Sequence, residues 1–296
     1  MKILIYGAGV IGCLYAALFS EAGYDVTIYA RGTRLDSLRE NGLRYVRKNK
    51  TSTAKVKLVG EVRDNDCFDY IFLTVREDQV HQALKELCGN SSPNIVTMVN
   101  TLEPYSNWED ICGKGRIMPA FPGAGGSFKD GILYADLTPR IIQPTTFAEI
   151  NGEMSQRLHT LAEIFRRSKI PYQIVKDMHS WQLCHLAMVV PIADAYYTAD
   201  HPERAGREKA VMRSTAQQMK HNFTRLHKSG VILSPPKMHI FRLLPVWVLR
   251  IGLSMVFESR FGNVFMYQHS MNAPEEMRCL HEQFYGWLAT AEIAAS

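Results

Sequence analysis

The sequence predicts an α/β fold in which a doubly wound parallel sheet is followed by an all-helical domain. Short apolar runs alternate with helical patterns over the first 176 residues, and only helical patterns remain from Asp177 onward. With 296 residues and 46% hydrophobic content, the chain can fill two cores. We therefore expect one domain over residues 1–176 and a second over residues 177–296.

The first predicted strand, residues 3–6, runs into the stretch Gly7-Ala8-Gly9-Val10-Ile11-Gly12, which has G-x-G-x-x-G spacing. A helix over residues 10–23 and a second strand from residue 25 follow at the distances that a Rossmann-type domain requires. Gly7 permits the tight turn, Gly9 lets the backbone approach a pyrophosphate, and Gly12 lets the helix pack on the strand. This stretch therefore predicts a dinucleotide site at a helix N-terminus.

The end of the second strand indicates which dinucleotide binds. An NAD site would place Asp or Glu there, whereas this chain has Ala30-Arg31-Gly32. Because an arginine pairs with a 2′-phosphate, we expect NADP(H) and assign Arg31 to that phosphate. Arg34 either assists or is a solvated residue of the next helix.

The remaining elements are expected in chain order. After the second strand, the first domain should contain a helix over 33–41 and a hairpin of 43–47 with 55–59. Strands at 69–75 and 94–99, with a helix at 78–87 between them, and a strand at 115–120 should follow. Short strands at 132–136 and 140–143, a helix at 153–168 and a strand at 171–175 should complete the domain. The second should hold helices over 177–197, 205–229, 236–257 and 274–294. The glycine-rich loop at residues 121–126 either approaches the ligand with its N–H groups or is a structural turn.

Composition narrows the class of partner. The net charge of +5 is spread along the chain without a polybasic run, which favours anionic small molecules over nucleic acid or a membrane surface. The six cysteines and the histidines have no metal-ligand spacing, so we expect reduced thiols, no metal and a cytoplasmic protein. The apolar residues 243–257 either complete the helical core or form a homodimer face.

Several stretches resemble the ketopantoate reductase (2-dehydropantoate 2-reductase) family. These are the glycine stretch, Tyr29-Ala30-Arg31-Gly32, Leu38-Arg39-Glu40-Asn41-Gly42-Leu43, Leu73-Thr74-Val75-Arg76 with Gln79, Asn100, and a helical domain that begins near Trp181. The resemblance implies that Thr74, Arg76 and Gln79 line the cofactor site. It also implies that Asn100, directly after a buried strand, lies beside the nicotinamide ribose and the substrate.

The second domain departs from the family pattern. The family carries lysine two residues after this tryptophan and asparagines four and eight residues further on, where this chain has Leu183, Ala187 and Pro191. The family's T-E-I-D-x-I-N stretch corresponds to residues 263–269 of this chain, which lack both carboxylates. Because the lysine protonates the developing alkoxide, its loss requires another donor. His185 and His269 are the candidates that join Asn100 as catalytic residues, although packing or surface exposure is the better explanation for each histidine, and Asp194 is a weaker candidate.

These observations predict an NADPH-dependent oxidoreductase that transfers hydride to a carbonyl or imine carbon of a small molecule bound between the two domains. The apolar replacements favour a substrate less polar than ketopantoate. The alternative is a non-catalytic NADPH-binding sensor that kept the cofactor site and lost the acid.

Overall fold

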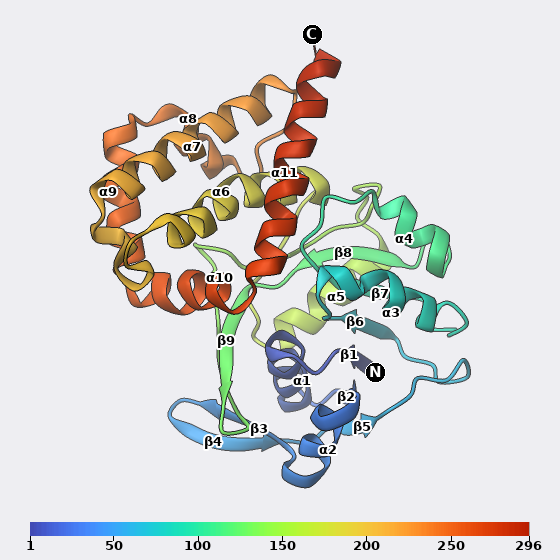
Figure 1. Ribbon diagram of the computed structural model, residues 1–296. Coiled ribbons are helices and arrows are strands. Elements are labelled where there is room, and N and C mark those ends of the chain that lie inside the picture. The colour runs from blue at the N-terminus through green and yellow to red at the C-terminus, as the bar shows by residue number, and fades with distance from the viewer. Residues whose placement is uncertain (296) are drawn as a thin grey trace. The chain divides into compact units, whose positions relative to one another are not determined.

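The computed structural model describes residues 1–295, which form two compact units. The first unit covers Met1–Met178 and the second begins at His179 (Figure 1). The first is a mixed α/β unit and the second is helical, which confirms the predicted fold class.

The main sheet of the first unit has eight strands in the order β12-β11-β8-β7-β6-β1-β2-β5. The strands from β8 to β5 in this order are all parallel, and β11 joins β8 in the antiparallel direction. The four residues of β6 and of β7 are all buried, as expected for strands covered on both faces. The bounds are β1 Lys2–Tyr6, β2 Asp25–Tyr29, β5 Lys57–Val59, β6 Tyr70–Leu73, β7 Ile95–Met98, β8 Ile117–Phe121, β11 Thr145–Phe147 and β12 Tyr172–Ile174.

Helices pack on this sheet through aromatic side chains. Phe19 of α1 (Val10–Glu21) lies 4.9 Å from Phe72 and 5.9 Å from Phe165 of α5 (Gln156–Arg167), measured between ring centroids. These fully buried rings hold α1 against the strands and so hold the glycine stretch at its start. The other helices of the unit are α2 (Gly32–Asn41), α3 (Val80–Leu87) and α4 (Tyr105–Cys112), the last of which the sequence analysis did not predict.

A second sheet of four strands, in the order β4-β3-β10-β9, corrects the predicted hairpin. Strand β3 (Leu43–Arg47) pairs with β4 (Lys50–Ala54), and the segment expected as its partner instead supplies β5 at the edge of the main sheet. The reason is the two-residue turn at Lys48 and Asn49, whose φ angles are 49° and 61°. Such a turn connects two hairpin strands with only two residues, which puts residues 50–54 opposite β3.

Two further expectations about this region are wrong. Residues 124–126 of the expected glycine-rich loop belong to β9 (Ala124–Lys129), which pairs with β10 (Ile132–Leu137). Residues 140–143 form a turn rather than a strand, because the N–H groups of Ile142 and Gln143 both donate to the Pro139 carbonyl.

The second unit, as far as it is described, consists of helices and turns. Its helices are α6 (Met178–Thr198, which starts at the last residue of the first unit), α7 (Lys209–Lys228), α8 (His239–Leu243), α9 (Val246–Phe257), α10 (Gln268–Asn272) and α11 (Pro274–Ala295). The expected single helix over 236–257 is broken before Pro245, and its two parts meet at an angle of 119°. None of the described helices is by itself long and apolar enough to cross a membrane, and only this bent pair meets the length and composition criteria when taken together.

Among the described residues, none of the six cysteines forms a disulfide. Cys13, Cys112 and Cys184 are buried, whereas Cys67, Cys88 and Cys279 are exposed.

Candidate nucleotide-binding site

The three glycines of the G-x-G-x-x-G stretch occupy different surroundings. A Cβ on Gly7, whose φ is +116°, would lie 2.8 Å from the Thr74 carbonyl oxygen, and one on Gly12 would lie 2.1 Å from the Gly7 carbonyl oxygen. A Cβ on Gly9 would meet no described atom within 4 Å. Gly7 and Gly12 are therefore required by packing, and Gly9 leaves an open face where α1 begins.

Thr74 closes this loop from the neighbouring strand. Its N–H donates to the Tyr6 carbonyl at 2.9 Å, and its hydroxyl donates to the Gly7 carbonyl at 2.8 Å. Of the other loop residues, Ala8 precedes the helix, and Val10 and Ile11 form its first turn, partly buried. The N–H groups of this turn have no earlier helical carbonyl to bind, so the first turn of α1 can receive an anion.

Arg34 holds the loop from the outside. Its Nε donates to the Ala8 carbonyl at 3.0 Å, and its Nη2 lies 3.3 Å from the Cys13 Sγ. The guanidinium carbon lies 4.0 Å from the centre of the Phe128 ring on β9. Arg34 is therefore neither a solvated helix residue nor a free cation, since it joins the glycine stretch to the second sheet.

Arg31 lies directly before α2, and its side chain is 62% exposed. Its Nη1 lies 3.3 Å from the Oε1 of Glu86 on α3. The sequence analysis expected no carboxylate here, because Glu86 is 55 residues further along the chain. No local pattern signals this contact, because only the fold brings the two residues together.

Arg76 and Gln79 lie in the turn that leads from β6 into α3, and both are exposed. Asn100 follows β7, as predicted, and is only 8% exposed. Among the described residues, nothing forms a hydrogen bond with its Oδ1. A buried carbonyl oxygen without a partner is rare and points to a donor on a ligand.

The predicted catalytic histidines lie in the second unit. His185 is 6% exposed, and its ring stacks on that of Trp181, with centroids 5.2 Å apart and planes 7° from parallel. His269 lies in α10, and its side chain is outside what the structure describes. Leu183 and Ala187, which the resemblance places at the family's lysine and first asparagine positions, are buried.

Asp194, a weaker candidate from the sequence, forms an acid and base pair with a histidine that the sequence analysis did not single out. His281 of α11 has its Nδ1 3.1 Å from both carboxylate oxygens of Asp194 of α6. Burial raises the pKa of the Asp194 carboxyl despite the opposing effect of His281. The two residues are 87 positions apart, so only the fold brings them together.

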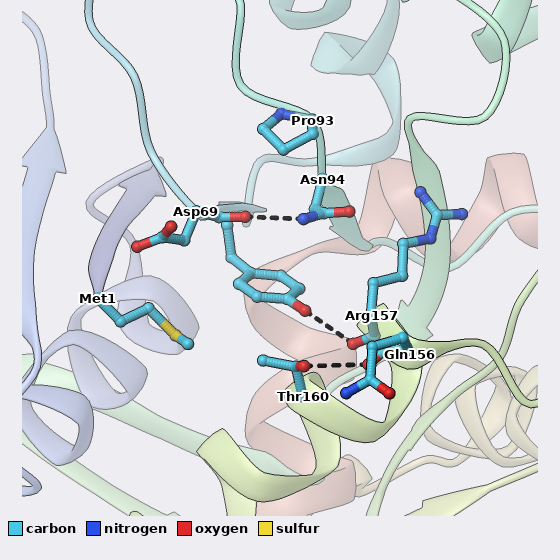
Figure 2. A pocket seen from close by; sticks show the side chains of 8 residues that line it. Met1, Asp69, Pro93, Asn94, Gln156, Arg157 and Thr160 are labelled. Carbon is cyan, nitrogen blue, oxygen red and sulfur yellow. Dashed lines mark hydrogen bonds between the residues drawn. The ribbon is translucent and has the colours of Figure 1, made fainter.

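One hollow of the first unit lies at the opposite ends of the strands from the glycine stretch. Figure 2 shows it near Met1, Asp69 and Asn94, which precede β1, β6 and β7. Because these strands are parallel, their amino ends share one edge, and the glycine stretch follows a carboxyl end. Its polar groups already bind one another, as where Asn94 Nδ2 donates to the Asp69 carbonyl at 2.9 Å. We do not assign the nucleotide to it.

In the part of the chain that the structure describes, no three His, Cys, Asp or Glu side chains lie close enough together to hold a metal ion.

Most of the first unit is similar to a known family. Residues 3–131 match the family described as ketopantoate reductase PanE/ApbA. A 2-dehydropantoate 2-reductase of Mesorhizobium japonicum is 26% identical over 201 residues, 61% of each chain, and one of Archaeoglobus fulgidus is 27% identical over 177 residues, 60% of this chain and 57% of the relative. The match thus spans about three fifths of the length of these curated relatives.

Solved structures share the fold over nearly the whole chain. A 2-dehydropantoate 2-reductase from Geobacter metallireducens has a TM-score of 0.71 at 14% identity, with 99% of this chain and 100% of that chain covered. The ternary structure of D-mandelate dehydrogenase with NADH and anilino(oxo)acetate has a TM-score of 0.64 at 14% identity, with 99% of each chain covered. At these identities the likeness establishes the fold.

Proposed function

The chain is a relative of the ketopantoate reductases, and on this premise we propose that it is an NADPH-dependent oxidoreductase acting on a carbonyl or imine carbon of a small molecule. The observation that carries the proposal is the contrast among the three glycines. Two are packed against the backbone and Thr74, and Gly9 alone leaves open space at a helix N-terminus. A pyrophosphate is the group that such a surface accepts.

The choice of NADPH rests on Arg31. It follows β2, where this class of fold binds the adenosine ribose, and its exposed guanidinium can pair with a 2′-phosphate. Arg76 and Gln79, exposed at the start of α3, are proposed to line the adenosine end.

Asn100 is proposed to orient the reacting end of the ligands. The bound nicotinamide supplies the hydride. The buried Oδ1 of Asn100 can accept a hydrogen bond from a ribose hydroxyl, a carboxamide or a substrate hydroxyl, and this bond fixes the position of the group that donates it.

The proton for the product must come from a residue other than the family's lysine, because Leu183 occupies that position. His185 and His269 are the donors proposed from the sequence, and the Asp194 and His281 pair is a third. In that pair the carboxylate sets the orientation of the imidazole through Nδ1, which makes Nε2 the nitrogen that can exchange a proton. An imine substrate that arrives protonated would need none of them.

The first test joins binding and turnover in one sample. NADPH binding is measured by fluorescence, and NADPH consumption by absorbance with ketopantoate, then with bulkier 2-oxo acids and cyclic imines. We expect binding, slow turnover of ketopantoate and faster turnover of a less polar substrate. Rapid turnover of ketopantoate would contradict our interpretation of Leu183, Ala187 and Pro191. Binding with no substrate oxidising NADPH would favour the sensor.

Gly9→Val tests the binding surface itself. Gly9 has extended backbone angles that valine adopts, and no described atom obstructs its Cβ, so the variant should fold normally. The added side chain fills the place proposed for the pyrophosphate, so we expect NADPH affinity to fall at least tenfold with an unchanged melting temperature. Gly286→Ala, an unobstructed glycine in α11, is the control. Unchanged affinity in Gly9→Val would place the nucleotide elsewhere.

A further inference from the structure

A carboxylate with four donors lies beside the arginine proposed for the 2′-phosphate. The Oε2 of Glu86 accepts hydrogen bonds from the hydroxyls of Tyr6 and of Tyr29, the latter at 3.2 Å. Its Oε1 accepts from Gln82 Nε2 at 3.1 Å and from Arg31 Nη1 at 3.3 Å. Tyr6 and Tyr29 are the last residues of β1 and β2, so the carboxylate lies under the carboxyl ends of these strands.

This carboxylate is charged at neutral pH. Partial burial on its own would raise the pKa of Glu86, but the hydrogen bonds from Tyr6 and Gln82 and the charge of Arg31 outweigh it, so the pKa lies below its ordinary value. Burial raises the pKa of the Tyr6 hydroxyl, which therefore stays protonated and remains a donor. Arg31 thus faces a permanent negative charge.

The carboxylate has the character that an NAD site normally requires. In folds of this class, Asp or Glu at the end of the second strand accepts the ribose 2′-hydroxyl, and an arginine near it accommodates a 2′-phosphate. Here the arginine comes from that strand end and the carboxylate comes from α3. Both chemical groups therefore meet at one place in the fold.

We propose that Glu86 determines cofactor specificity by limiting the preference of Arg31 for NADPH, so that the protein binds NADH with comparable affinity. This inference rests on the proposed function. A 2′-phosphate would have to share Arg31 with Glu86 and would bring further negative charge close to a carboxylate. A 2′-hydroxyl carries no charge and has no such penalty.

The experiment compares dissociation constants for NADPH and NADH by nucleotide fluorescence, with no substrate present. In the unaltered protein we expect the two constants to differ by less than about tenfold. Glu86→Gln keeps the size and acceptor oxygen of the side chain and removes its charge, so NADPH should bind at least tenfold more tightly relative to NADH. Raising the salt concentration should reduce this difference between the two proteins, because salt screens charge. Glu163→Gln, an exposed glutamate of α5, is the matched control.

The outcomes separate the two proposals. An NADPH preference above about tenfold in the unaltered protein would overturn the role of Glu86, and this measurement needs no variant. An unchanged or lower NADPH preference in Glu86→Gln would overturn it as well and would leave the oxidoreductase proposal intact. If neither nucleotide binds, the proposed function fails and this inference fails with it.

Discussion

Arg31 and Arg34 lie one helical turn apart, yet their side chains have different surroundings. Arg31 is exposed beside Glu86, whereas Arg34 binds the Ala8 carbonyl and covers the Phe128 ring. An arginine in a sequence motif therefore does not by itself indicate a ligand contact. The hydrogen-bond partners of each guanidinium distinguish a residue that recognises a phosphate from one that supports the loop.

This difference predicts opposite patterns of nucleotide affinity. Arg31→Ala should weaken NADPH binding severalfold and leave NADH binding almost unchanged, because the 2′-phosphate alone loses its partner. Arg34→Ala should weaken both nucleotides to a similar degree, because the glycine stretch loses its support. Isothermal titration of both nucleotides into both variants tests this. Selective loss of NADPH in Arg34→Ala would exchange the two assignments.

A buried ion pair of the first unit gives a pH-dependent prediction. Glu149 is 6% exposed and binds Arg157, whose guanidinium also donates to the Ile117 carbonyl. Burial alone would raise the pKa of Glu149, but the hydrogen bonds from Arg157 and Ser155 lower it below the ordinary value. A lowered pKa in the folded state stabilises the protein above about pH 4.3, the pKa of an unfolded glutamate, and this contribution is lost as the pH falls through the folded pKa.

Arg157→Met should therefore lower the free energy of unfolding by about 3 kcal/mol at pH 7, because it leaves a buried charge without its partner. The deficit should shrink as the pH falls, since Glu149 can then take up a proton. Urea unfolding at pH 7 and pH 4 measures both values. Arg166→Met breaks an exposed pair with Glu163 on the same helix and should cost less than about 1 kcal/mol. A deficit independent of pH would show that packing, not charge, dominates.

At the scale of elements, the strand and helix order around the glycine stretch follows from the sequence, because apolar strands and helix starts are local patterns. The predicted hairpin partner of β3 was wrong because the turn at Lys48 and Asn49 has no glycine to signal it in the sequence. Both residues nevertheless adopt left-handed backbone angles. Helix α4 could have been found, since Tyr105, Trp108 and Cys112 are buried at helical spacing. Glu86 and His281 could not, because their partners are distant in the sequence.

Helix α9 is apolar on opposite sides. Leu249, Leu253 and Phe257 are buried, whereas Trp247 is 64% exposed and Met255 is 69% exposed. A helix that is apolar all round normally has both sides covered. Six apolar side chains of α8 and α9 are exposed, each with an accessible area on the order of 100 Å². Their summed area approaches the ~800 Å² per partner that a standard interface buries. They are Ile240, Leu243, Trp247, Ile251, Met255 and Val256.

We therefore expect this face to pack against a second copy of the chain. Trp247→Glu with Met255→Lys should convert a dimer to a monomer in light scattering after gel filtration. Ile141→Glu, which alters an 83% exposed residue of the first unit, should leave the dimer intact. A monomer at every concentration of the unaltered protein would contradict the expectation.

For the whole molecule, similarity of sequence and similarity of fold extend over different lengths. The family match ends at residue 131, whereas the shared fold covers 99% of the chain. In the second unit, Leu183 and Ala187 are buried at the positions where the resemblance implies polar residues. A fold can persist through such changes because apolar side chains maintain the packing of its helices.

The buried Cys13 can be used to detect local opening of the glycine stretch. Its Sγ lies 3.4 Å from the Ala8 carbonyl, and burial raises the pKa of the thiol, so thiol reagents reach it only when the glycine stretch opens. With the exposed Cys67, Cys88 and Cys279 replaced by serine, the rate of alkylation at Cys13, separated from that at Cys112 and Cys184 by peptide mass spectrometry, would measure local opening. A nucleotide that holds this stretch closed would lower the alkylation rate of Cys13. Comparing the rates with and without nucleotide would therefore measure how often the stretch opens, without any substrate.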